Sequence, residues 1–213
     1  MQIRNVFLAA LFGIPATIAT ASSHAPSPPS TSLLNSTQPV ALFDLPNAFP
    51  GSDYVPDPCD VEAIRNALAH YPLCIDGKNF AALSLVFAPN AVANYSAPLG
   101  VLTPLSTIES SLQSSLSTVT TQHAFGTQVI DVLTRNTAVS VTYYTATHFG
   151  IGAYAGQIVT AHGQYQDVWS RQTDKTWRIS HRNLVFMVRP KAFYNQGLCT
   201  SLTIIIRVLS SEI

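Results

Sequence analysis

The amino-acid sequence predicts an α+β fold, in which helices come first and a meander of long strands follows. Two observations predict it. Apolar residues recur at helical spacing between residues 60 and 116, and from residue 119 the pattern changes to alternation over four long runs. Because helices that precede such a meander pack on one face of the sheet, we expect them to cover one side of an antiparallel sheet.

The chain begins with a pattern that is typical of targeting. Arg4 supplies a positive charge, residues 6–18 form a short apolar stretch, and Ala19-Thr20-Ala21 is a cleavage site of small residues. Together they predict a signal peptide over 1–21. We therefore expect a protein that is secreted or resides in the secretory pathway.

One domain is expected after a leader. Residues 22–56 are rich in Ser and Pro, which predicts a disordered segment, and Asn35-Ser36-Thr37 is a glycosylation sequon within it. The length that remains suits a single domain over 57–190. A tail over 191–213 follows, with an apolar run that could be an edge strand or a subunit contact.

The amino-acid composition narrows the classes of molecule that this protein is expected to bind. Eleven basic and eleven acidic residues give a net charge of zero without any basic run, which argues against nucleic acid. No long apolar segment follows residue 21, so a membrane-embedded enzyme is not expected either. A small apolar or aromatic substrate fits this composition.

Three cysteines do not form a zinc-binding pattern, and we expect neither a metal nor an organic cofactor. Cys59 and Cys74 bracket a predicted helix and would lie about 20 Å apart, beyond disulfide reach. Cys59 with Cys199 is the remaining pairing, and the sequence leaves it open.

The elements follow in order. Val61, Ile64, Leu68 and Tyr71 mark a helix from residue 60, which Pro72 is expected to limit, with an irregular turn to residue 77. A short helix over 79–87, a strand over 91–97 and a helix over 103–116 come next. Period-two alternation then predicts strands over 119–133, 138–149, 157–171 and 176–188.

The residues that indicate chemistry are His123, His148 and Asp76. Only 10% of residues are charged, so imidazoles among Thr, Val and Ala on strands are unlike ordinary surface residues. Alternation puts His123 on one face of its strand and His148 with Tyr144 on one face of the next. If both faces look toward the helices, the imidazoles share an apolar cup. The alternatives are satisfied core histidines, and Asp76 as a helix-end turn residue.

A family resemblance supports the first interpretation. It is carried by Cys-Ile-Asp-Gly-Lys-Asn-Phe over 74–80, Phe-Ala-Pro-Asn-Ala over 87–91, Thr-Gln-His over 121–123, Thr-His over 147–148, and the segment 169–177. The sequence over 61–188 resembles the SnoaL-like group of the nuclear transport factor 2-like superfamily, and within it the fungal scytalone dehydratases of secondary metabolism. The resemblance implies a cone-shaped barrel of strongly curved antiparallel sheet, with N-terminal helices covering the pocket, and a homo-oligomer of two or three chains.

The resemblance also implies roles. Asp76 matches the carboxylate that orients the catalytic histidine, His123 the base, and His148 a second histidine beside the leaving hydroxyl. Tyr95 matches a tyrosine that polarises the substrate carbonyl through a water; the alternative is a packing aromatic.

The substrate-contacting residues depart from the family pattern. A second carbonyl-side tyrosine is replaced by Ile75, and the serine and asparagine of the third long strand fall at Gln164 and Gln166. These glutamines are candidate substrate contacts or solvent-facing polar residues. Phe125, Leu184 and Phe186 are further candidate substrate contacts. Arg182 is expected at the rim as a salt-bridge partner, and the alternative is a cation in the pocket.

These residues suit a dehydratase that acts on a hydroxylated aromatic or polyketide-derived ketone without a cofactor. Removing water beta to a carbonyl needs a base for the alpha proton, a donor to the enolate oxygen and an acid for the hydroxyl. Two alternatives keep the same fold: a SnoaL-like polyketide cyclase or isomerase, and a non-catalytic module that binds a small ligand.

Overall fold

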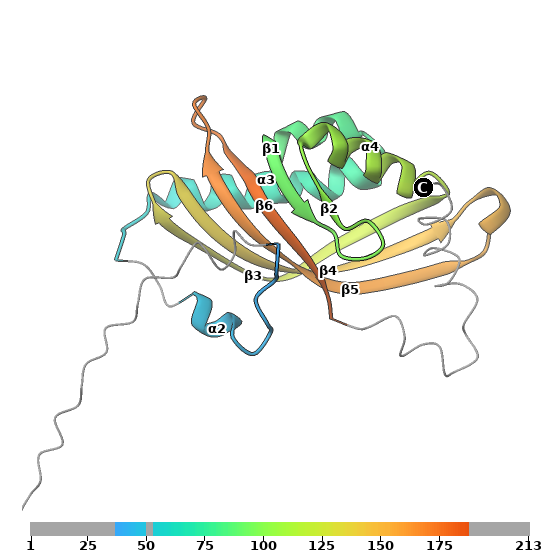
Figure 1. Ribbon diagram of the computed structural model, residues 1–213, viewed down its shortest axis with the longest axis horizontal. Coiled ribbons are helices and arrows are strands. Elements are labelled where there is room, and N and C mark those ends of the chain that lie inside the picture. Colours follow the sequence, from blue (N-terminus) through green and yellow to red (C-terminus); the bar gives the residue numbers. More distant parts are fainter. Residues whose placement is uncertain (1–36, 50–52, 188–213) are drawn as a thin grey trace, which may run out of the picture.

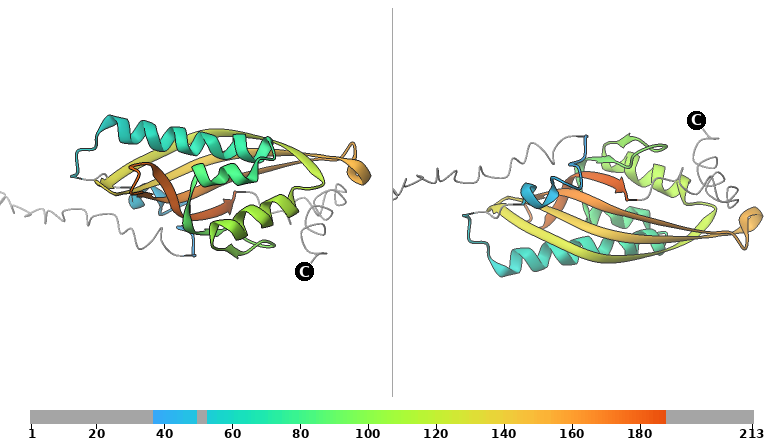
Figure 2. Two further views of the ribbon diagram at one scale, coloured as in Figure 1. Left: turned by 90° about the horizontal axis from the view of Figure 1, so that it is seen from above. Right: turned by 90° about the horizontal axis from the view of Figure 1, so that it is seen from below.

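The computed structural model describes residues 37–49 and 53–187, and within them a curved six-stranded sheet carries helices on one face (Figures 1 and 2). The sheet order is β2-β1-β6-β5-β4-β3. The strands are β1 (Phe87–Asn94), β2 (Val101–Leu102), β3 (Val119–Thr134), β4 (Thr137–Gly150), β5 (Ile158–Arg171) and β6 (Trp177–Phe186). The helices are α2 (Leu45–Ala48), α3 (Pro58–Asp76), α4 (Leu105–Ser115) and the 3₁₀ turns η1 (Phe80–Leu85) and η2 (Gly152–Tyr154).

The α+β class is confirmed, and two features of the sheet differ from the expectation. β1 and β6 pair in parallel, whereas the other neighbours pair antiparallel. β2 and β3 stand at opposite ends of the strand order, so the described sheet is open and is not a closed barrel. The parallel pair joins strands separated by the whole β3–β5 meander, and local alternation carries no information on such a pairing.

Helix α3 is fixed at its start and buries one face. Asp57 caps it by accepting a hydrogen bond from the Cys59 N–H, and Pro58 occupies the first position, where no N–H is needed. Asp60 accepts from the Trp177 indole N–H at 3.0 Å and from Arg171 at 3.2 Å, which ties the helix to the sheet. Ile64, Leu68 and Tyr71 of the predicted stripe are buried together with Cys74 and Ile75, and Val61 is partly buried.

The helix continues through Pro72 to Asp76, which differs from the predicted limit at Pro72. A proline inside a helix costs about 3 kcal/mol because it removes one backbone hydrogen bond. Leu68, Tyr71 and Ile75 around it are at most 2% exposed, so their burial offsets this cost. The extra turn carries Asp76 to the helix end beside β3.

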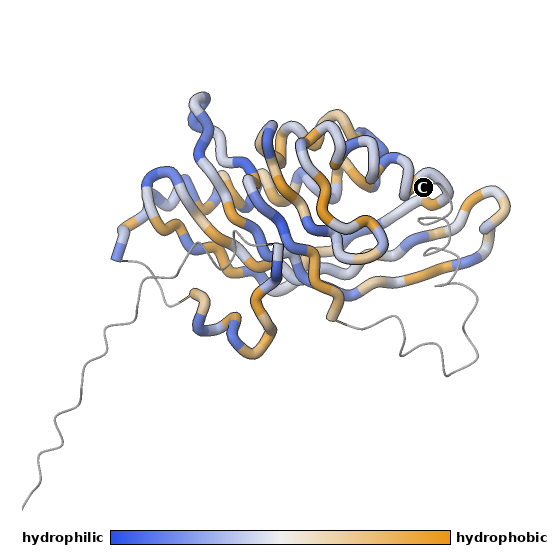
Figure 3. Tube along the Cα trace, in the orientation of Figure 1, coloured by the Kyte–Doolittle hydropathy of each residue, from blue (hydrophilic) through white to orange (hydrophobic). Residues whose placement is uncertain are grey.

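β1 begins earlier than expected. Phe87, predicted at a helix end, is already in the strand, and the pairing with β6 shifts register between Phe87 and Val92. Pro89 lies within this irregularity, where its missing N–H removes no regular ladder bond. The four long strands lie within two residues of their predicted bounds, and their tubes change repeatedly between hydrophilic and hydrophobic residues (Figure 3).

Residues 37–49 lie on the face of the sheet opposite α3 and α4 (Figure 1). Val40 and Phe49 pack against Val139 and Val168. The side-chain amide of Gln166 accepts from the Val40 N–H and donates to the Val40 carbonyl, both at 2.8 Å. This part of the chain therefore differs from the disordered leader expected over 22–56, because apolar contacts and two hydrogen bonds hold it.

Several predictions fall outside the described residues: the signal peptide over 1–21, the sequon at Asn35, Cys199 with its candidate bridge to Cys59, and the tail over 191–213. They stay predictions, as does the oligomeric state. Among the described helices, none is long and apolar enough to cross a membrane.

The contact between Gln166 and Val40 gives a first test. We expect Gln166→Leu to leave the Val40 N–H and C=O without partners, which weakens the docking of residues 37–49 by about 1–3 kcal/mol. Amide hydrogen exchange at Val40 should then accelerate by roughly ten- to a hundredfold. Gln113→Leu on the exposed side of α4 is the control. Unchanged exchange at Val40 would show that the amide does not hold the segment.

Candidate active site

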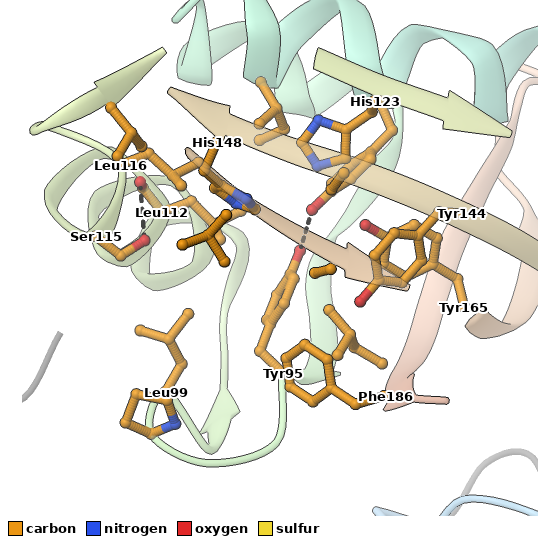
Figure 4. Close-up of a pocket in the computed structure, with 18 of the residues that line it drawn as sticks. Tyr95, Leu99, Leu112, Ser115, Leu116, His123, Tyr144, His148, Tyr165 and Phe186 are labelled. Atoms are coloured by element: carbon orange, nitrogen blue, oxygen red, sulfur yellow. Dashed lines mark hydrogen bonds between the residues drawn. The ribbon is translucent and has the colours of Figure 1, made fainter. Parts of the chain in front are cut away.

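A pocket lies between the inner face of the sheet and the helices, with a cavity volume of about 180 Å³ (Figure 4). Its wall is largely apolar and comes from α3, α4, the β1–β2 connection and four strands. The polar side chains in the wall are few: Tyr71, Tyr95, Ser115, Thr118, His123, Tyr144, His148 and Tyr165. A mostly apolar cavity with a few convergent polar groups is typical of a small-molecule site.

Asp76 and His123 form the hydrogen-bonded centre of this site. The His123 Nδ1 lies 2.7 Å from Asp76 Oδ1, and the His123 backbone N–H donates to Oδ2 at 2.9 Å. The Thr121 hydroxyl donates to Oδ1 at 2.8 Å. Because a carboxylate accepts at Nδ1, this nitrogen carries the proton and Nε2 keeps its lone pair. The arrangement leaves His123 with a basic nitrogen.

The carboxylate is held in its charged form. Burial by itself would raise the pKa of Asp76, but the hydrogen bonds from His123 and Thr121 outweigh it and hold that pKa below its ordinary value. Lys78 lies nearby and donates to the Leu116 carbonyl at 3.2 Å. Asp76 therefore orients His123 as an anion at neutral pH.

His148 lies beside His123, as the strand alternation predicted. The ring centroids are 6.3 Å apart and the planes meet at 68°, and both residues line the pocket (Figure 4). Burial lowers the pKa of His148, and the positive charge that His123 can carry lowers it further. Its Nδ1 is buried without a hydrogen-bond partner among the described residues. His148 is thus a neutral imidazole near neutral pH.

Tyrosines form a wall of the pocket next to His123, because the Tyr71 ring lies edge-on to the His123 ring with centroids 6.2 Å apart. Tyr95, the predicted carbonyl-side residue, lines the pocket, and its hydroxyl lies 3.2 Å from that of Tyr71. Tyr144 and Tyr165 stack with ring centroids 4.5 Å apart. Both are pocket residues that the sequence analysis did not assign to the site, although Tyr144 shares a strand face with His148.

Gly163 makes room for this stack. A Cβ at this position would lie 2.6 Å from the Tyr144 hydroxyl oxygen and 2.5 Å from the Val185 carbonyl oxygen. Because Gly163 and Tyr144 are register partners, the tyrosine ring covers the bare glycine backbone. The position of the aromatic wall therefore depends on the missing side chain.

The structure brings together only part of the predicted substrate-binding set. Leu184 and Phe186 line the pocket, whereas Phe125 does not line it and is a partly buried residue that packs edge-on against Tyr165. Gln164 and Gln166 are fully buried but do not line the pocket.

The two glutamines were assigned to the wrong face of β5. Alternation turns Gly163 and Tyr165 toward the pocket, so the residues on either side of Tyr165 point away from it. Gln166 binds the N-terminal segment instead. The expectation that they are solvent-facing is also wrong, since both are 0% exposed.

Arg182 differs most from its prediction. It was expected at the rim, but it is 0% exposed and forms a bidentate ion pair with Asp167, from Nε to Oδ1 at 2.7 Å and from Nη2 to Oδ2 at 2.8 Å. A signal was available at Asp167, whose strand face also carries the core residues Tyr165 and Trp169.

Within the described ranges, no group of three or more His, Cys, Asp or Glu side chains is arranged to hold a metal ion. The polar side chains of the pocket wall are imidazoles, phenols and the hydroxyls of Ser115 and Thr118, with Asp76 hydrogen-bonded to His123.

Fold and pocket together define an α+β protein of the nuclear transport factor 2-like kind, with a small-molecule site between sheet and helices. The chain belongs to the SnoaL-like domain family, whose model matches residues 58–183. No curated protein matches it.

Solved structures of low identity share the fold. The protein Kfla4162 from Kribbella flavida is 20% identical, with a TM-score of 0.57 over 63% of this chain and 95% of that one. A candidate scytalone dehydratase from Novosphingobium aromaticivorans is 19% identical, with a TM-score of 0.55 over 61% and 85%. A nuclear transport factor 2-like superfamily protein from Salmonella enterica is 17% identical, with a TM-score of 0.53 over 61% and 94%.

The environment of His148 predicts a pH dependence. In an NMR titration we expect its midpoint below the ordinary 6.5, and a rise toward 6.5 in His123→Ala, which removes the neighbouring charge. The unfolded chain takes up this proton at about pH 6.5 and the folded chain only at lower pH. This residue therefore lowers the free energy of unfolding as the pH falls from 6.5 to the folded pKa. A midpoint above 6.5 would contradict the burial argument.

The close contacts around Gly163 predict that adding a side chain there destabilises the protein. Gly163→Ala forces a methyl group against a strand carbonyl and a tyrosine ring, which should lower the free energy of unfolding by about 1–3 kcal/mol. Gly126→Ala is the matched control, because nothing lies within 4 Å of a Cβ there. Denaturant unfolding of both variants measures the difference, and equal midpoints would refute the crowding.

Proposed function

We propose that this protein is a cofactor-independent hydro-lyase, a dehydratase that removes water from a hydroxylated aromatic or polyketide-derived ketone. One observation carries the proposal: a carboxylate fixes His123 in one tautomer inside an apolar pocket, with a second imidazole and a tyrosine hydroxyl in the same cavity. Base, donor and leaving-group contact are the three requirements of this elimination.

The proposed steps conserve protons. Nε2 of His123 takes the alpha proton, and the electrons of the C–H bond form the enolate, whose oxygen accepts a hydrogen bond from Tyr95. The enolate then expels the beta hydroxyl, which leaves as water with the proton that His123 carried. His148 is neutral and is proposed to orient the hydroxyl rather than to supply the proton, because burial lowers its pKa. The ketone becomes an enone, and His123 regains its starting form.

Size and polarity support the substrate class. A cavity of about 150 Å³ with an apolar lining accommodates benzene, and this pocket, at about 180 Å³, is somewhat larger. Leu112, Leu116, Leu184 and Phe186 give it apolar walls. A compact ketone of one or two rings fits these dimensions.

The test measures water loss from a two-ring beta-hydroxy ketone, 3-hydroxytetralone, whose product tautomerises to a naphthol with a distinct absorbance. We expect turnover by the wild type and a loss of about 10²- to 10⁴-fold in kcat/KM for His123→Ala, because a general base contributes that factor. Circular dichroism and unfolding midpoints check that the variant folds.

His162→Ala is the matched control, since this imidazole is exposed on the face of the sheet opposite the pocket and hydrogen-bonds to Thr145 of β4. Wild-type-like turnover by His123→Ala would refute the proposed base. If the wild type gives an isomer of unchanged mass, the cyclase or isomerase alternative replaces the lyase. Binding of the ketone without conversion would leave a ligand-binding module.

A further inference from the structure

The middle of β6 is hydrophilic, yet it is buried. His181, Arg182 and Asn183 form this run (Figure 3), and none is more than 4% exposed. Arg182 places a full positive charge in the core, with Asp167 as its carboxylate partner. Burying such a pair is seldom a net gain in stability over apolar residues of similar volume. The pair therefore calls for a role beyond holding the sheet together.

The guanidinium lies directly behind the tyrosine wall of the pocket. Its Cζ is 4.1 Å from the ring centroid of Tyr165 and 4.4 Å from that of Tyr71. Both tyrosines line the pocket, and the Tyr71 hydroxyl continues to the Tyr95 hydroxyl at 3.2 Å. A short path of contacts thus leads from the buried cation to the hydroxyl proposed to meet the substrate oxygen.

The electrostatic potential of the ion pair at the tyrosine wall is positive, although the pair as a whole carries no net charge. Burial raises the pKa of Tyr71, Tyr95, Tyr144 and Tyr165, and Arg182 opposes this rise at all four. Asp167 has a lesser, opposite effect on Tyr71. Such a field acts strongly in an apolar cavity, where little water screens it.

We propose that Arg182 is a positioning residue of the pocket: through Tyr71 it strengthens the hydrogen bond that Tyr95 donates, so that the tyrosine wall favours an anionic oxygen on a ring. This inference rests on the proposed function, in which the ketone oxygen becomes an enolate. It adds a ligand preference: a molecule that carries negative charge on the oxygen at this wall binds more tightly than its uncharged counterpart.

The probe is naphthol, whose anion resembles such an enolate, with methylnaphthalene as its uncharged counterpart. Replacing Arg182 alone would leave Asp167 buried without a partner, so the variant is Arg182→Met with Asp167→Leu, two apolar residues in place of the pair. Fluorescence distinguishes bound naphthol from naphtholate and gives the pKa of the bound probe, and calorimetry gives both affinities.

We expect the pKa of bound naphthol to rise by about one unit in the double variant, so that naphtholate binds about tenfold more weakly. Affinity for methylnaphthalene should change less than twofold. A purely structural role of the ion pair would weaken both ligands by the same factor. The proposal would be overturned by any of three results: equal weakening of both ligands, an unchanged pKa of the bound probe, or no binding of naphthol by the wild type.

A second variant keeps the test valid if the double variant fails to fold. Tyr71→Phe retains the ring against Arg182 but removes the hydroxyl that contacts Tyr95, and it should shift the pKa of bound naphthol upward as well. Tyr143→Phe is the control, since Tyr143 is the register partner of Gln164 and does not line the pocket. A shift in Tyr143→Phe, or none in Tyr71→Phe, would contradict the path.

The two proposals fail separately, because naphthol binding needs no turnover. If the pKa of bound naphthol depends on Arg182 but the protein releases no water from the ketone, only the proposed lyase activity is refuted. If the protein releases water from the ketone but the pKa of bound naphthol does not depend on Arg182, only this inference is refuted.

Discussion

The hydrogen bonds between Asp76 and β3 are the constraint on which the pocket depends. A carboxylate at the carboxyl end of a helix meets the negative end of the helix dipole, which disfavours it. Here Thr121 and His123 supply three hydrogen bonds that compensate. They also fix the end of α3 against β3, the strand that carries His123. Helix packing and the orientation of the imidazole thus have one cause.

The pocket brings two kinds of polar group together inside an apolar wall. The Tyr71 ring lies edge-on to the His123 ring with centroids 6.2 Å apart, and the Tyr71 hydroxyl lies 3.2 Å from that of Tyr95 (Figure 4). Imidazoles and phenols therefore lie side by side, and one bound molecule can contact both. In an apolar cavity their hydrogen bonds are stronger than in water.

The long strands and the meeting of the two imidazoles could be predicted, because alternation and helical spacing are local signals. His123 and His148 meet because alternation on adjacent strands turned both inward. Gln164 and Gln166 were assigned to the site by the family resemblance and not by this rule, and alternation puts them on the face of β5 opposite Tyr165.

What could not be predicted depends on tertiary context. A charged residue such as Arg182 on a terminal strand has the same local pattern whether it lies at a rim or in the core. Only the position of Asp167 on the adjacent strand distinguishes the two. The parallel pairing of β1 with β6 and the docking of residues 37–49 likewise arise from contacts between distant parts of the chain.

The bare backbone at Gly163 also bears on how such a pocket diversifies. A larger residue there meets the Val185 carbonyl oxygen as well as the Tyr144 ring, so a smaller residue at position 144 does not by itself make room for it. Position 163 should therefore stay glycine among related chains while position 144 varies. Reshaping the cavity for a bulkier molecule is better begun at position 144, where a smaller side chain leaves the glycine and the strand pairing unchanged.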